Sequence, residues 1–370
     1  MSEKNNKLKT LIIFAPFIEI GGIEKNLVIL TNYLAKHIRN IALITWNKKD
    51  KKLFNKRVKF IKPSSIFLRY KNRNVRNIIS IFLLINFIIN NKDSVIFSFQ
   101  SNLYVTIVAK IFNIKNIIRI ASYGWMLNRF KKIIFYLILR LPNQIIVNSN
   151  DLRKNLKKEL NINSKCIYNP LNINQINNSK KTKKKLFKGG KKILKILFLG
   201  RLVHVKNPMM FVKALNIINK NINFRALIVG KGRLEEQISN YIKINNLEKK
   251  VKILKQNSNG MQFLNQCDLI ILTSKYEGLP NVLIEAQFLK KYIISTNCKT
   301  GPSEILMGGK LGTLVNIDDY IGLKKKIEYF YYYKNSIEIK KKIREGFYHL
   351  YRFDFEKNCQ NYKKVICKYL

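Results

Sequence analysis

Two carboxylates, Glu277 and Glu285, stand eight positions apart in SKYEGLPNVLIEA (274–286), within a chain that has 70 Lys and Arg but only 21 Asp and Glu. The apolar run DLIILTS precedes them and predicts a buried strand, and Pro280 can begin a helix without losing a needed N–H group. Glu277 then falls in a loop, and Glu285 falls one to two turns into the helix. An ionised carboxylate accepts two hydrogen bonds, so either could hold adjacent hydroxyls of a sugar or ribose ring. An ordinary surface glutamate followed by one on a helix face is the alternative.

Two cations follow another predicted strand. In FLGRLVHVKNP (198–208) the strand ends on Gly200, and Arg201 and Lys206 come next. Arginine offers a planar fork of donors and lysine a compact point charge, so together they suit a diphosphate. Cations placed by chance are the alternative, because the chain carries a formal net charge of +49.

A glycine pair, Gly21-Gly22, lies between the first predicted strand and a predicted helix at 23–37. Glycines allow a ligand to approach the backbone closely, and the start of a helix offers free N–H groups to an anion. An ordinary strand-to-helix turn would look the same. The pair is therefore a weak indication of an anion site.

The pattern of apolar runs predicts the elements that must position these residues. A first series of strands is expected at 11–17, 41–46, 94–99, 117–122 and 144–149. After a polar, lysine-rich stretch the pattern restarts, with strands at 195–200, 224–232, 251–254, 268–274 and 292–297. Runs that are apolar throughout and separated by helices are typical of buried parallel strands, which indicates two doubly wound α/β domains. Ligands bind at the carboxyl ends of such strands, and the cleft between two domains is the natural site.

The composition of the chain limits the cell compartments and the partners to consider. No apolar run is long enough to span a bilayer, and five scattered cysteines without metal-ligand spacing favour a reducing cytoplasm. The net charge suggests an anionic lipid surface or nucleic acid as partner, although codon composition would explain many lysines equally well. Nucleic-acid binding would need a known binding module or basic residues interleaved with exposed aromatics, and neither is visible.

Two segments are candidates for a membrane surface. Residues 48–76 hold twelve basic residues and a single acid, Asp50. The segment 124–143 mixes Trp, Phe and Tyr with Arg and Lys, which is the composition of an interfacial helix. A solvated face and a core helix with a basic side are the respective alternatives.

These motifs together resemble the retaining, family-4-type glycosyltransferases of the GT-B fold, especially bacterial enzymes that build surface glycans on lipid carriers. EGLPNVLIEA resembles the Glu-x7-Glu motif of that family, and GRLVHVKNP its diphosphate motif. Further resemblances, in family order, are GGIEKNL, VNSNDLRKNL, IYNPLN and TGPSEILMGGKLGTLV. The resemblance implies two Rossmann-like domains that face a central cleft. We expect an acceptor-side domain at 1–172, a linker at 173–192, a nucleotide-sugar domain at 193–352 and a helix at 353–370 that packs back on the first domain.

The resemblance also implies roles for the candidate residues. Arg201 and Lys206 would bind the diphosphate of the donor near Gly21-Gly22, Glu277 would contact the transferred sugar, and Glu285 would hold the ribose. Backbone close to the sugar would come from Gly278, Leu279, Pro280 and Asn281. The donor would be a nucleotide-diphosphate sugar, and a UDP-sugar is expected ahead of other nucleotide sugars. It would bind without a metal or another cofactor. The acceptor would be a glycan or a lipid-linked molecule. The enzyme would be cytoplasmic and bound peripherally to the inner face of the cell membrane.

One departure from the family concerns the acceptor side. Many relatives carry a His after a middle strand of the first domain, but no His lies between His37 and His204. Arg119, Ser122 or Tyr123 could replace it, and the sequence leaves that choice open. A catalytically silent relative that acts as a scaffold is the alternative function.

Overall fold

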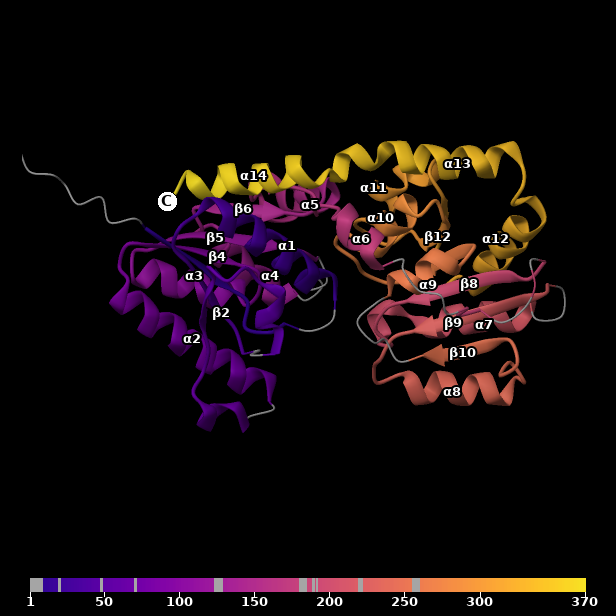
Figure 1. Cartoon of the computed structure of the whole chain (residues 1–370), viewed down its shortest axis with the longest axis horizontal. Coiled ribbons are helices and arrows are strands. Elements are labelled where there is room, and N and C mark those ends of the chain that lie inside the picture. The colour runs from indigo at the N-terminus through magenta and orange to yellow at the C-terminus, as the bar shows by residue number, and fades with distance from the viewer. Residues whose placement is uncertain are drawn as a thin grey trace, which may run out of the picture. The chain divides into compact units, whose positions relative to one another are not determined.

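The computed structural model describes residues 9–18, 21–46, 49–69, 72–122, 129–179, 185–187, 190, 192–218, 222–254 and 260–370. The chain divides into two compact units, each built on its own sheet (Figure 1). The first takes in the described parts of residues 1–121 and 125–170 together with Phe355–Leu370, and the second consists mainly of Leu171–Asp354. Two parallel, doubly wound α/β sheets confirm the predicted fold class.

The first sheet has the order β3-β2-β1-β4-β5-β6-β7, with every neighbouring pair parallel. Its strands are β1 Thr10–Phe14, β2 Ile41–Ile44, β3 Lys59–Ile61, β4 Ser94–Ser98, β5 Lys115–Ile120, β6 Gln144–Val147 and β7 Lys165–Cys166. The helices of this unit are α1 Gly22–His37, α2 Arg73–Asn90, α3 Asn102–Ile111, α4 Arg129–Ile138, α5 Asn150–Leu160 and α14 Phe355–Cys367.

Both faces of the first sheet are covered, because successive side chains of a strand point to opposite sides. Leu11 and Ile13 of β1 belong to the core under α1 and α14, whereas Ile12 and Phe14 belong to the core under α2 and α3. The helix α14, yellow in Figure 1, contacts α1 and buries Tyr362 in the first of these cores. This double burial explains why the strands read as continuous apolar runs.

The second sheet has the order β10-β9-β8-β11-β12-β13, again with parallel pairs. Its strands are β8 Leu194–Leu199, β9 Phe224–Val229, β10 Val251–Leu254, β11 Leu269–Leu272, β12 Tyr292–Thr296 and β13 Thr313–Val315. The helices of this unit are α6 Ile173–Ser179, α7 Pro208–Ile218, α8 Glu235–Ile244, α9 Met261–Gln266, α10 Asn281–Phe288, α11 Pro302–Ile305, α12 Tyr320–Tyr333 and α13 Ile337–Tyr348.

The stretch expected to be a linker, 173–192, has structure of its own where it is described. It begins with α6, and Ile176 and Phe187 are buried. The backbone N–H of Leu186 also donates to the side chain of Gln266 at 2.9 Å. The stretch is polar overall, but its few buried apolar side chains attach it to the second unit.

Candidate functional site

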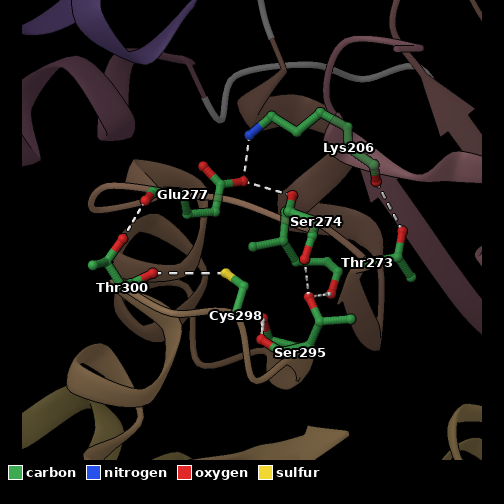
Figure 2. A network of polar contacts seen from close by, with 9 residues as sticks. Lys206, Thr273, Ser274, Glu277, Ser295, Cys298 and Thr300 are labelled. Carbon is green, nitrogen blue, oxygen red and sulfur yellow. Dashed lines mark hydrogen bonds and ion pairs between the residues drawn. The ribbon is translucent and has the colours of Figure 1, made fainter. Parts of the chain in front are cut away.

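Strands β8 and β11 pair at the centre of the second sheet, where the order of the strands reverses. In open α/β sheets, ligands bind outside the carboxyl ends of the strands at this switch point. Lys206 follows β8 and Glu277 follows β11, and the Lys206 ammonium forms an ion pair with the Glu277 carboxylate there (Figure 2). The fold thus brings together two of the predicted catalytic residues. Their side chains are largely buried, at 20% and 10% exposed.

Three hydrogen bonds attach the loop after β8 to the loop after β11. The Thr273 hydroxyl donates to the carbonyls of Lys206 and Asn207 at 3.0 and 2.8 Å, and the Lys275 N–H donates to the Val205 carbonyl at 2.8 Å. A fourth contact acts on the acid, because the Ser274 hydroxyl donates to the Glu277 carboxylate oxygen at 2.6 Å. The position of the ion pair therefore depends on both loops.

The loop after β12 supports Glu277 from the other direction (Figure 2). The Thr300 hydroxyl donates to the Glu277 carbonyl, and the Thr296 hydroxyl donates to the Ser274 carbonyl at 2.6 Å. Gly301 has a φ of +88°, and a Cβ there would lie 2.3 Å from the carbonyl oxygen of Gly278. Only a glycine fits this close approach without strain. The ends of three neighbouring strands, β8, β11 and β12, therefore all contribute contacts to Glu277.

The other predicted residues of this unit lie near the same strand ends or in α10. Arg201 is exposed directly after β8, whereas Gly278, Leu279 and Pro280 are buried before α10. Asn281 is the first residue of α10 and is half-buried.

Glu285 is 5% exposed in the second turn of α10. Neither acid of the opening motif is therefore an ordinary solvated glutamate. Burial of a charge is costly without partners, so both positions are specific features of the fold.

Gly21 and Gly22 belong to the first unit and lie at the start of α1, as predicted. Gly21 precedes the helix in an extended conformation, and a Cβ there would lie 2.7 Å from a carboxylate oxygen of Glu24. The loop before them is held by Gln100, whose amide exchanges hydrogen bonds of 3.0 and 2.9 Å with the backbone of Phe17.

Residues 178–345 match the family described as Glycosyl transferases group 1. This part of the chain, which lies in the second unit, is therefore similar to that family. The matched residues include the Lys206–Glu277 pair and Glu285, and Gly21-Gly22 lie outside them.

The similar curated proteins are glycosyltransferases too. A stretch of 135 residues is 36% identical to a GalNAc-alpha-(1->4)-GalNAc-alpha-(1->3)-diNAcBac-PP-undecaprenol alpha-1,4-N-acetyl-D-galactosaminyltransferase of Campylobacter jejuni. That similarity spans 36% of this chain and 37% of the relative's own length. An uncharacterized glycosyltransferase of Methanocaldococcus jannaschii is 28% identical over 93% of this chain and 79% of its own.

Solved structures of low identity share the whole fold. A glycosyltransferase from Rickettsia africae has a TM-score of 0.78 at 20% identity, covering 98% of this chain and 99% of its own. Anabaena HepE, solved with UDP and glucose, has a TM-score of 0.79 at 16% identity, covering 97% of this chain and all of its own. The chain has the GT-B fold.

Cys298 lies beside Glu277, and its thiol contacts the Thr300 carbonyl at 3.6 Å (Figure 2). Burial, with a contribution from the charge of Glu277, raises the pKa of the Cys298 thiol to about 12. The thiol is therefore protonated at neutral pH and is a poor nucleophile. Among the described residues, no group of three or more His, Cys, Asp or Glu side chains could hold a metal ion.

The structure corrects one suggestion about the first unit. Arg119 of β5 is 1% exposed, and its guanidinium donates to the Tyr362 hydroxyl at 3.1 Å and to the Asn169 side chain at 2.7 Å. It therefore holds α14 inside the unit and is not available to an acceptor. Ser122 is exposed, and Tyr123 lies outside the described residues.

Sequence reasoning missed the hydroxyl groups around Glu277: Thr273, Ser274, Thr296 and Thr300. A signal was present for three of them, because Thr273, Ser274 and Thr296 end or follow apolar runs in LTSKYEG and ISTNCKTG. Small hydroxyl residues at the ends of buried strands often bond to neighbouring backbone. In the second unit these hydroxyl groups join three loops around Glu277.

Proposed function

We propose that the chain is a retaining glycosyltransferase that moves a sugar from a nucleotide-diphosphate donor to a lipid-linked glycan acceptor in bacterial surface polysaccharide synthesis. The observation that carries this proposal is the Lys206–Glu277 ion pair at the switch point of the second sheet. The match of residues 178–345 to the glycosyl transferases group 1 family and the Campylobacter jejuni relative support the transferase class. The UDP bound in the similar Anabaena structure favours a UDP-sugar donor.

The site offers the charges that such a reaction needs. Breaking the bond between the sugar and the diphosphate builds negative charge on the leaving group, which Lys206 and the exposed Arg201 would stabilise. An ammonium has three donors, so Lys206 can bind a phosphate oxygen while it keeps its contact with Glu277. Glu277 would accept a hydrogen bond from a hydroxyl of the transferred sugar, and Glu285 would hold the ribose.

The chemistry would need no nucleophile from the protein and no metal. The acceptor hydroxyl would attack the sugar on the face from which the diphosphate leaves, and the leaving phosphate would take its proton. The new glycosidic bond then has the configuration of the donor bond. The Cys298 thiol would stay protonated and take no part.

Nucleotide release from a panel of nucleotide sugars tests the proposal, with chelator present to check metal independence. Arg201→Ala and Lys206→Ala should each lower release from the preferred donor by on the order of tenfold or more, since each removes a charge-assisted contact. Lys243→Ala on α8 is the matched control, because it removes an exposed cation of the same unit. Equal damage in the control would show that general charge, not the site, is responsible. A folded protein that released no nucleotide from any donor, with or without lipid-linked acceptors, would point to the scaffold alternative.

A further inference from the structure

Three helices of the first unit each carry a pair of exposed apolar side chains one turn apart. The pairs are Ile78 and Phe82 on α2, Ile107 and Ile111 on α3, and Ile133 and Leu137 on α4. These six residues, here called the apolar surface, are between 40% and 72% exposed. Spacing of i and i+4 places each pair on one side of its helix.

The three helices are neighbours. Helix α3 contacts both α2 and α4, and α2 and α3 pack their other sides on the sheet through buried residues such as Leu84 and Val105 (Figure 1). Each of these two helices is thus apolar toward the sheet and also apolar toward the outside. Exposed apolar side chains that gather in this way usually mark an interaction surface.

The charge around this surface has one sign. Residues 72–141, which contain all three helices, hold a single acid, Asp93, and ten Lys and Arg, of which Arg119 is buried. The basic region that precedes α2 contacts this helix, since the Lys59 ammonium lies 5.9 Å from the centre of the Phe87 ring. Just after α4, the Arg140 guanidinium lies 3.9 Å from the centre of the Tyr136 ring of that helix. A surface that lies in a membrane interface typically combines apolar and aromatic side chains with Lys and Arg.

We propose that the apolar surface of α2, α3 and α4 docks on an anionic lipid bilayer, with the surrounding cations bound to lipid headgroups. A second copy of the chain fits less well, because it would bring two positive surfaces together. Nucleic acid would satisfy the cations but would leave the aliphatic side chains exposed. No helix in the described part of the chain is long and apolar enough to cross the bilayer, so this docking is peripheral. The inference rests on the surface itself and does not depend on the proposed reaction.

Cosedimentation of the full chain with lipid vesicles tests the proposal. Wild type should bind phosphatidylcholine vesicles that contain phosphatidylglycerol, bind pure phosphatidylcholine vesicles much less, and lose binding as salt screens the charges. Replacing exposed apolar side chains with glutamine keeps the charge and removes insertion into the interface. Ile111→Gln combined with Leu137→Gln should lower the partition coefficient roughly tenfold.

The matched control combines Ile244→Gln with Ile337→Gln, two even more exposed positions of the second unit, and it should bind vesicles like wild type. Nucleotide release in solution should be the same in all three proteins, which separates this test from the proposed reaction. Wild-type binding by the Ile111/Leu137 variant would overturn the proposal, as would equal binding of wild type to both kinds of vesicle. A dimer in light scattering that only this variant dissociates, with no vesicle binding, would assign the surface to a second copy instead.

Discussion

Glu277 accepts hydrogen bonds from Ser274 and Lys206, and we propose that it contacts the reacting sugar. Glu277→Gln keeps the size of the side chain but removes a charge-assisted acceptor, which costs about 1.5–3 kcal/mol in a buried setting. If the contact is strongest in the transition state, turnover should fall by roughly ten- to a hundredfold with little change in KM. Steady-state kinetics would measure this, with Glu345→Gln on α13 as a control. Turnover like that of wild type would remove Glu277 from the sugar site.

Glu285 should behave differently, because its carboxylate lies in the second turn of α10 and is assigned to the ribose. Glu285→Gln should weaken binding of donor and free nucleoside diphosphate alike, by on the order of tenfold, since the same ribose contact is lost from both. Calorimetric titration with the nucleoside diphosphate measures this directly. Unchanged affinity would refute the ribose assignment, and comparison with Glu277→Gln would show whether the two acids have separate roles.

At the scale of elements, the contact between the loops after β11 and β12 depends on Gly301. Gly301→Ala would combine a φ of +88° with a collision at the Gly278 carbonyl. We expect a lower thermal unfolding midpoint and a loss of turnover, because the loop that carries Glu277 must shift. Gly308→Ala is the control, since its φ is +67° but nothing lies within 4 Å of the added Cβ. It should show only the conformational cost of about 1–2 kcal/mol. Equal turnover in the two variants would contradict the role of the close approach.

Elements also differed in how well the sequence predicted them. Central strands such as β1 and β11 were predicted because burial on both faces makes them apolar throughout. Three of the four edge strands, β3, β7 and β13, were not, because they are two or three residues long and partly exposed. Their pairing depends on a neighbouring strand and leaves little trace in local composition.

At the scale of the whole molecule, sequence predicted the two sheets and the chemically reactive residues better than their surroundings. Lys206 and Glu277 could be found because their types and positions after strands suggest an anion and a sugar. Their mutual contact could not, since it depends on loops 71 positions apart. The suggestion of Arg119 for the acceptor failed for the same reason, because its partner Tyr362 is 243 positions away. Long-range packing, which decides burial, is the part that local patterns do not encode.

The place of α14 in the core of the first unit has a consequence for how the protein is made. Residues 355–370 leave the ribosome after the whole of Leu171–Asp354, yet they fill the core that begins with β1. At about 5–20 residues per second, the nascent first unit waits roughly 10–40 s for this helix. The second unit is nearly continuous in sequence, and its last residue, Asp354, is synthesised before residues 355–370. The unit whose synthesis begins first is therefore the unit whose chain is completed last.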